Sequence, residues 1–472
     1  MTNHIPLYRS LANEFESQIE SGVFIPGEKM PSVRNTAEMR KISVITVLKA
    51  YQILEQKGLI HSMPKSGYYI AFHNTRKNQQ QETIAPQEVH VFDLIRNYTR
   101  ESANTSGLLG TGLPARDIVP IQQMNRILIH ELRLEEFQQL RVVQGEGDDL
   151  FRAQIVKYLM MKNLSPSKDN VLISNGCTES IYLCLHSLCN PGDQIAMQSP
   201  CSFGILQMAE TMKLKVLEIP PDETDGIDVA HLQYILENYE IKAVYLNPNV
   251  NNPLGTILSA DAKKAIADLA NEKKVFVIED DVMSDLCYDS NLPLPIKAYD
   301  TGGYVIHCSS FTKTLLPTYR VGWVYSDLLS ERIIQYKRAL NVGTPLLQQA
   351  VISELLESGN YFKYIRKARS LYAERTARLR NDLVSSFPRE SSISTPEGGY
   401  LLWVKLPESV PADTFFNRLL AENISVLPGI IFSPNNRYAD CFRINSANYG
   451  EQERAIILRM GEIASDLARS NY

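Results

Sequence analysis

The sequence predicts an α/β protein in which a small helical head is joined to a larger body with a mainly parallel sheet. A chain of 472 residues is too long for one ordinary hydrophobic core, so two or three domains are expected. Residues 1–72 combine helical periodicity with a hairpin pattern, whereas residues 93–472 alternate short apolar runs with helical stretches. Residues 73–92 are polar and predict a mobile linker between the two domains.

The charge of the chain is unevenly distributed. Residues 1–76 hold nine Lys and Arg against six Asp and Glu, so their formal charge is +3 and the remainder carries −8 of the total of −5. A mildly basic head on an acidic body is compatible with nucleic acid at the head. Charged residues make up 21% of the chain and the apolar class 44%, which is ordinary globular composition.

Cysteine usage and hydropathy predict a cytoplasmic location. The seven cysteines show no CxxC pair and no disulfide-framework spacing, which fits a reducing compartment. The first residues lack the basic-then-apolar pattern of a signal peptide. No apolar run approaches the roughly 18 residues of a membrane span, so no membrane partner is expected.

The head has the pattern of three short helices followed by a β-hairpin. The first helix is indicated by four apolar residues at every fourth position, Leu7, Leu11, Phe15 and Ile19. Ser32 and Ser43 are the expected N-caps of the second and third helices. The third helix has apolar positions at Val44, Val47, Leu48, Tyr51 and Leu54. Residues 59–71 alternate as a hairpin with a turn at residues 64–67.

Three helices and a hairpin predict a winged helix-turn-helix. The third helix would enter the major groove of double-stranded DNA, and the hairpin would touch the flanking backbone. A small helical domain that binds a protein or nothing is the alternative. The candidate DNA-binding residues are Ser32, Arg34, Lys41, Ser43, Thr46, Lys49, Lys65 and Gly67.

Two stretches of the head carry a family resemblance. Met30-Pro31-Ser32-Val33-Arg34, and Ser43 to Gly58 with its Thr46-Val47 and Ala50-Tyr51 pairs, resemble the signature of the GntR family of regulators. The match spans most of residues 7–70. One departure is that the arginine usual after the cap serine is missing, and Ile45 lies in that stretch.

The body contains short apolar runs separated by helical stretches. This alternation indicates a mainly parallel sheet with helices on both faces, in which a ligand lies beyond the carboxyl ends of the strands. The predicted strands cover residues 170–174, 194–197, 215–219, 243–246, 275–278 and 304–306.

Lys313 follows the last of these runs, among small hydroxyl residues. A lysine just past a strand end can form a Schiff base, and Ser310 and Arg320 on either side of it suit a phosphate. Together they suggest a phosphorylated aldehyde, pyridoxal 5′-phosphate (PLP). A surface lysine in a Ser/Thr loop is the alternative.

Further candidates follow other runs. Gly176, Cys177 and Thr178 form a glycine turn that opens a helix, which is a phosphate cradle. Phe203 could stack on a flat ring or belong to the core. Asn252 could hydrogen-bond a phenolic oxygen. Asp280, at a buried strand end, could meet a protonated pyridine nitrogen; an ion pair or a metal is the alternative. No His or Cys lies nearby at metal-ligand spacing, so no metal is expected.

The order of these motifs resembles the fold-type I PLP enzymes, the aspartate aminotransferase class, over roughly residues 105–465. The resemblance implies a fold-type I domain with a small C-terminal α/β subdomain. It also implies a head-to-tail homodimer, in which each head crosses over its partner. It assigns Lys313 to the Schiff base, Asp280 to the pyridine nitrogen and Asn252 to the ring hydroxyl. Phe203 matches the stacking residue, and Arg443 matches the arginine that grips a substrate carboxylate. The phosphate cup would consist of Gly176, Cys177, Thr178, Ser310 and Arg320.

Two tyrosines of that class are absent. One should fall near Val282 or Met283 and the other near Val142. Because a hydrogen bond to a charged group contributes about 1.5–3 kcal/mol, we expect weaker PLP binding and slow or absent transamination.

A winged helix joined to this fold resembles the MocR subfamily of GntR regulators. The resemblance implies a PLP-dependent transcriptional regulator that senses an amino compound or a B6 vitamer, PLP itself included. A working aminotransferase with an appended DNA-binding domain is the alternative.

Overall fold

The computed structural model describes most of the chain. The described residues are 7–20, 24, 28–57, 59–63, 67–70, 85–96, 109–134, 145–222, 224, 226–435 and 437–470.

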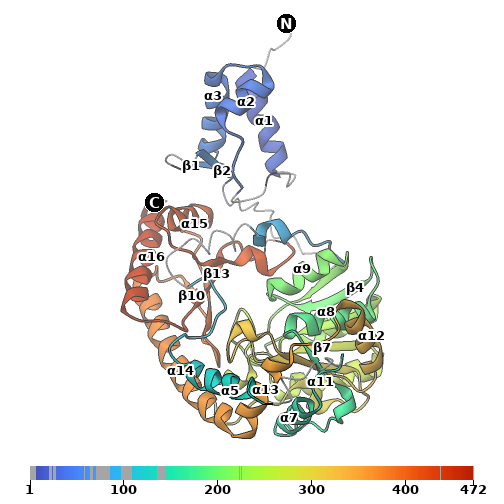
Figure 1. Ribbon diagram of the computed structural model, residues 1–472. Coiled ribbons are helices and arrows are strands. Elements are labelled where there is room, and N and C mark those ends of the chain that lie inside the picture. The colour runs from blue at the N-terminus through green and yellow to red at the C-terminus, as the bar shows by residue number, and fades with distance from the viewer. Residues whose placement is uncertain are drawn as a thin grey trace.

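The head consists of three helices and a two-stranded antiparallel hairpin (Figure 1). Its helices are α1 (Leu7–Glu20), α2 (Val33–Arg40) and α3 (Val44–Gln56), and its strands are β1 (Ile60–Met63) and β2 (Gly67–Ile70). The predicted winged helix-turn-helix arrangement is confirmed.

Both predicted N-caps of the head are present. Ser32 Oγ accepts a hydrogen bond from the Asn35 N–H at 3.2 Å, and Ser43 Oγ accepts one from the Thr46 N–H at 3.1 Å. Each bond satisfies one of the amide groups that a helix start leaves without a partner.

The head core is smaller than the apolar pattern predicted. Leu11, Phe15, Val47, Tyr51 and Leu54 are buried in it. Three residues expected on the apolar faces are exposed instead, namely Leu7, Val44 and Leu48. The prediction was wrong for these three because Leu7 is the first residue of α1, and Val44 and Leu48 lie on the outer face of α3.

The body is built on a seven-stranded sheet. In spatial order its strands are β3 (Val171–Ser174), β9 (Gly322–Tyr325), β8 (Val305–Ser310), β7 (Phe276–Asp280), β6 (Ile241–Leu246), β4 (Gln194–Gln198) and β5 (Lys215–Ile219). The neighbours β8, β7, β6, β4 and β5 pair in parallel. All six predicted strands are present, and the mainly parallel sheet is confirmed.

The sequence reasoning missed β9. This strand is only four residues long and pairs antiparallel with both β3 and β8. It begins two residues after Arg320, so the segment that carries one of the candidate phosphate ligands also supplies a strand between β3 and β8.

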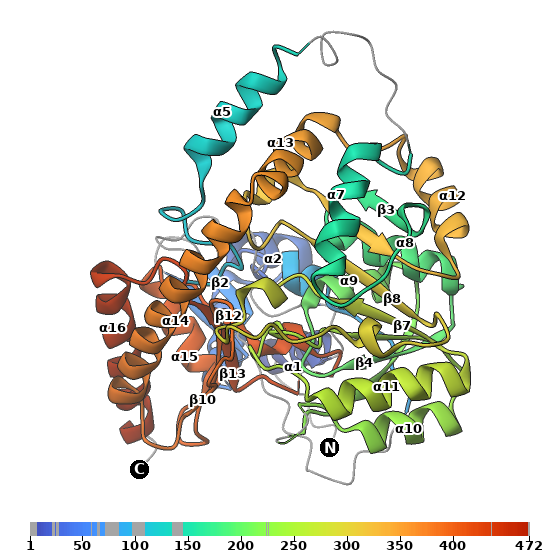
Figure 2. The ribbon, with the colours of Figure 1, turned by 90° about the horizontal axis from the view of Figure 1, so that it is seen from below.

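Helices cover both faces of the sheet (Figure 2). The helices of this part are α7 (Asp149–Met160), α8 (Cys177–Leu188), α9 (Phe203–Thr211), α10 (Val229–Asn238), α11 (Ala260–Lys273) and α12 (Ser330–Leu340). Met197 and Tyr245 point to the side covered by α8 and α9, whereas Ala196 and Val244 point to the side covered by α10 and α11.

The C-terminal part forms a separate small sheet, as predicted. Its antiparallel strands are, in spatial order, β10 (Ser392–Ile393), β11 (Leu401–Lys405), β13 (Cys441–Asn445) and β12 (Leu427–Pro428). The remaining helices are α5 (Ile121–Glu131), α13 (Leu346–Glu357), α14 (Asn360–Ser386), α15 (Ala412–Ala421) and α16 (Glu451–Ser470).

The cysteines and the helices add two observations. All seven cysteines are buried free thiols. No helix in the described ranges is long and apolar enough to cross a membrane.

Candidate functional site

A cavity of about 230 Å³ lies beyond the carboxyl ends of the parallel strands, where the sheet topology predicts a ligand. It brings together residues from both sheets of the body. Of the candidates singled out in the sequence, the cavity is lined by Cys177, Thr178, Phe203, Asn252, Asp280, Ser310, Lys313, Arg320 and Arg443. Gly176 lies directly beside it, as the N-cap of α8.

One end of the cavity is suited to an anion. The α8 N-terminus opens at Gly176, whose φ is +91°, and a Cβ there would lie 2.9 Å from Arg320 Nη2. The Arg320 guanidinium donates a hydrogen bond to the Asn175 carbonyl at 3.0 Å. Thr312 Oγ1 is buried and has no hydrogen-bond partner among the described residues. A helix N-terminus, a guanidinium and a hydroxyl without a partner together fit a phosphate group.

Asp280 occupies the floor of the cavity as the last residue of β7. Its carboxylate accepts hydrogen bonds from Tyr245 at 3.0 Å, from the Cys177 thiol at 3.3 Å and from the Val282 N–H at 3.2 Å. Burial raises the pKa of Asp280, and these donors oppose that rise. A buried carboxylate beside a cavity suits a cationic ligand atom.

Lys313 faces the same space. Its amino group donates a hydrogen bond to the Gly112 carbonyl at 2.8 Å. Burial, and then the positive charge of Arg443, lower the pKa of Lys313 from 10.5 to about 8. A lysine with a lowered pKa has a larger neutral fraction near pH 7, which is the nucleophilic form.

The sequence reasoning missed Gly112 and Tyr245. A Cβ at residue 112 would lie 2.9 Å from Lys313 Nζ, so a larger residue would displace the amino group. Its only signal in the sequence is the close pair Gly110 and Gly112 ahead of Pro114. Tyr245 carried a weaker signal, since it is a strand residue whose side chain has a polar end.

Arg443 is a buried cation in the lining of the same cavity. From β13 it donates hydrogen bonds to Asn252 Oδ1 at 2.9 Å and to the Gly110 carbonyl at 3.2 Å, and it lies over the Phe432 ring. The Arg443 Nε has no hydrogen-bond partner among the described residues. No carboxylate among those residues forms an ion pair with the Arg443 guanidinium. Burial lowers the pKa of Arg443 to about 10. A buried cation without a counter-ion suits an anionic ligand.

Phe203 is the first residue of α9 and packs edge-on against Phe432, with ring centroids 6.0 Å apart. It therefore both lines the cavity and contacts the core.

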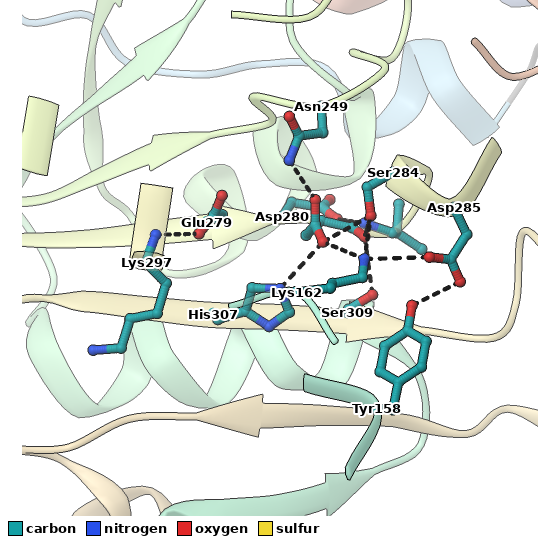
Figure 3. A network of polar contacts seen from close by, with 12 residues as sticks. Tyr158, Lys162, Asn249, Glu279, Asp280, Ser284, Asp285, Lys297, His307 and Ser309 are labelled. Atoms are coloured by element: carbon teal, nitrogen blue, oxygen red, sulfur yellow. Dashed lines mark hydrogen bonds and ion pairs between the residues drawn. The ribbon is translucent and has the colours of Figure 1, made fainter. Parts of the chain in front are cut away.

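A buried polar network is built around Asp281, and Figure 3 draws this network. Asp281 binds Lys162 at 2.9 Å, His307 at 3.2 Å and Asn249 at 2.8 Å. Burial alone would raise the pKa of Asp281, but Lys162 and His307 hold it well below its usual range. Because Asp281 follows Asp280 directly, the network fixes the backbone that carries the cavity carboxylate. Lys162 gave no signal in the sequence beyond a charge after an apolar helix.

Neither tyrosine nearest to the missing ones reaches the cavity. The Tyr158 hydroxyl donates to Asp285 at 2.6 Å, and the Tyr288 hydroxyl donates to the Gly399 carbonyl at 2.8 Å. Val282 and Met283 line the cavity in place of a hydroxyl. Val142 lies outside the described residues.

The candidate DNA-binding residues lie on the outer surface of the head. Ser32, Arg34, Lys41, Ser43, Lys49 and Gly67 are exposed, and Thr46 is half-buried. The hydroxyls of Ser32 and Ser43 are already used as caps. Lys65 lies outside the described residues.

The head and body together define a class of protein, a winged-helix domain fused to an aminotransferase fold. Residues 7–70 match the family of bacterial regulatory proteins called gntR, and residues 111–459 match aminotransferase class I and II. The chain therefore belongs to the GntR regulators that carry an aminotransferase-like domain, the MocR pattern.

Individual relatives agree with this membership. The chain is 34% identical to the uncharacterized HTH-type transcriptional regulator YjiR of Escherichia coli (strain K12), covering 96% of this chain and 98% of that protein. It is 26% identical to the HTH-type transcriptional regulator NorG of Staphylococcus aureus (strain USA300), covering 87% and 93%. A multiple substrate aminotransferase from Thermococcus profundus is similar in structure, with a TM-score of 0.74, 25% identity and coverage of 80% and 95%.

Proposed function

We propose that the chain is a PLP-binding transcriptional regulator whose aminotransferase-like body senses an amino compound or PLP itself and whose head binds double-stranded DNA. One observation carries the proposal. Lys313, Asp280, Arg320 and Arg443 line a single cavity in a chain whose head matches the gntR family.

The residues around the cavity fit PLP. Lys313 would hold its aldehyde carbon, Asp280 its ring nitrogen and Asn252 its ring hydroxyl, while Phe203 would lie against the ring. Bound PLP supplies an electron sink to a covalently held amine. The phosphate would be held by Gly176, Cys177, Thr178, Ser310 and Arg320.

Arg443 would bind the carboxylate of an amino-acid-like effector. The Arg443 and Lys313 side chains both lie close to Gly112, because a Cβ at residue 112 would be 2.9 Å from Lys313 Nζ and 3.6 Å from Arg443 Nη2. An effector amine that competes with Lys313 would free the lysine amino group. Such a ligand can change DNA binding only through its different affinity for the two states of the protein.

A homodimer would complete the molecule. Large apolar side chains are exposed on the body, with exposed fractions of 51% for Ile129, 72% for Leu150 and 70% for Val342. Exposed apolar groups of this size suit a protein interface. We propose a cytoplasmic, head-to-tail dimer with a head at residues 1–72, a linker at 73–92 and an effector domain at 93–472.

The test combines spectroscopy with DNA binding. Full-length protein is titrated with PLP, and a visible absorption band is expected that Lys313→Ala lacks. Gel shifts on DNA upstream of the protein's own gene, with and without PLP, test the regulator function. No band and no shift would contradict the proposal.

Catalytic transamination is the second candidate, because the gathered lysine, aspartate and arginine are the groups that such a reaction uses. Steady turnover with amino donors, without any DNA binding, would favour it. A change in DNA affinity on adding PLP alone would favour a B6-vitamer sensor.

A further inference from the structure

The recognition helix α3 has an exposed apolar face. The exposed fractions are 44% for Val44, 66% for Ile45 and 36% for Leu48. We propose that this face reads the C5-methyl groups of thymines in the major groove of the operator. The inference rests on the proposed DNA-binding function and specifies which chemistry selects the DNA.

The three residues form one continuous surface. Val44 and Leu48 are four residues apart, and Ile45 and Leu48 are three apart, so all three are neighbours on the helix surface. The core-facing side of α3 is a different set, because Val47, Ala50, Tyr51 and Leu54 are fully buried in the head. The exposed face is therefore not needed to hold α3 in place.

This face lies where base contacts are made. In helix-turn-helix proteins the N-terminal residues of the recognition helix contact base edges. Val44 is the first residue of α3, directly after the Ser43 cap. The chain thus places aliphatic side chains at the positions with the best access to bases.

The hydroxyl groups at the start of α3 are engaged with each other. Ser43 Oγ accepts a hydrogen bond from the Thr46 N–H at 3.1 Å and lies 2.7 Å from Thr46 Oγ1. The first turn therefore presents mainly methyl and methylene groups. In the major groove only thymine offers a methyl group, and apolar side chains contact it.

The surrounding charge favours DNA over a protein partner. Arg34, Lys41 and Lys49 are exposed, and none of them forms an ion pair within the described part of the chain. By contrast, Arg40 and Lys57 are paired with Glu14 and Glu16. Cations without a counter-ion, next to the exposed apolar face, can bind the DNA phosphates that flank a contacted base.

The experiment compares thymine with uracil, which lacks only the methyl group. Full-length protein selects duplexes from a random library, and footprinting of the selected sequence defines the protected thymines. Replacing one contacted thymine by uracil is expected to weaken binding about fourfold, the effect of one buried methyl group. Uracil at thymines outside the footprint is the control and should change nothing.

Two variants assign the effect to residues. Ile45→Ala should bind the thymine duplex more weakly than the wild type does. Its affinities for the thymine and uracil duplexes should be equal, so that the preference for thymine disappears. Lys49→Ala should weaken both duplexes alike and keep the preference, because a phosphate contact is independent of sequence. Thermal unfolding of both variants checks that the head remains folded.

Each other outcome contradicts something specific. Equal binding of thymine and uracil duplexes by the wild type overturns the methyl readout and leaves the DNA-binding function intact. A full preference in Ile45→Ala overturns it too, as does a change of oligomeric state in that variant, since the face would then be a protein interface. Failure to select any duplex would instead contradict the proposed function.

Discussion

The Tyr245 hydroxyl donates a hydrogen bond to Asp280 Oδ2 at 3.0 Å, from β6 to the neighbouring strand β7. The Cys177 thiol donates to the other oxygen at 3.3 Å. Burial raises the pKa of Asp280, so these donors favour the ionised carboxylate that would pair with a protonated ring nitrogen.

Tyr245→Phe is therefore expected to weaken PLP binding at least about tenfold, since a hydrogen bond to a charged group contributes about 1.5–3 kcal/mol. Absorption titrations with PLP measure the change. Tyr288→Phe is the matched control, because its hydroxyl bonds the Gly399 carbonyl instead. Equal affinities of Tyr245→Phe and wild type would show that Asp280 does not need this donor.

The pKa of Lys313 predicts a pH dependence. Only the neutral amine attacks the aldehyde, and burial together with Arg443 lowers the pKa of Lys313 to about 8. The rate of covalent PLP attachment should therefore rise with pH and level off above about pH 8, rather than near the ordinary 10.5. Stopped-flow absorbance across this range measures it.

Arg443→Met removes one cause of that lowered pKa, so the midpoint should move to higher pH. An unchanged midpoint would mean that Arg443 does not contribute to the lowered pKa of Lys313. A midpoint near 10.5 in the wild type would contradict the lowered pKa.

The buried network around Asp281 predicts that removing one of its charges will strongly lower the free energy of unfolding. Lys162→Met would remove the amino group that lies 2.9 Å from Asp281 and 3.3 Å from Asp285, and would leave Asp281 with His307 as its remaining basic neighbour. Breaking a buried ion pair costs about 3–5 kcal/mol. Chemical denaturation measures the free energy of unfolding of the body.

Lys405→Met is the control for that measurement. Lys405 lies 3.8 Å from Asp440 with 60% of its side chain exposed, and an exposed pair contributes about 0–1 kcal/mol. Similar losses in the two variants would contradict a special role of the buried network.

The strand pattern of the body was readable from sequence because each parallel strand is a short apolar run. Most candidate site residues could be predicted for the same reason. Each follows such a run, and the carboxyl ends of parallel strands meet at one edge of the sheet. Gly112 and Arg443 meet Lys313 only through tertiary folding, and Gly112 carries no chemistry of its own. Arg443 was placed by family resemblance, not by spacing.

The feature that the sequence predicted least well was which apolar side chains of the head are exposed. Helical periodicity treats Val44, Val47 and Leu48 alike, yet only Val47 is buried. A three-helix head has room in its core for one face of α3, and the sequence does not say which of two apolar faces is inside. Strand β9 was missed for a different reason, because a run of only four residues is too short to show a strand pattern.

The position of Arg443 predicts that the body distinguishes amino acids from amines that lack a carboxylate. Its Nη1 bonds Asn252 at 2.9 Å, while its Nε has no partner among the described residues. Arg443→Met should weaken the binding of effective amino acids about a hundredfold or more, because paired hydrogen bonds to a carboxylate are lost.

The measurement is the change of the visible PLP band when the standard amino acids are added to the full-length protein. Arg459→Met serves as a control, because Arg459 is exposed and pairs with Glu422. Methylamine, which has no carboxylate, should perturb wild type and Arg443→Met to the same extent. An equal loss for methylamine and for amino acids would show that Arg443 shapes the cavity without recognising the carboxylate.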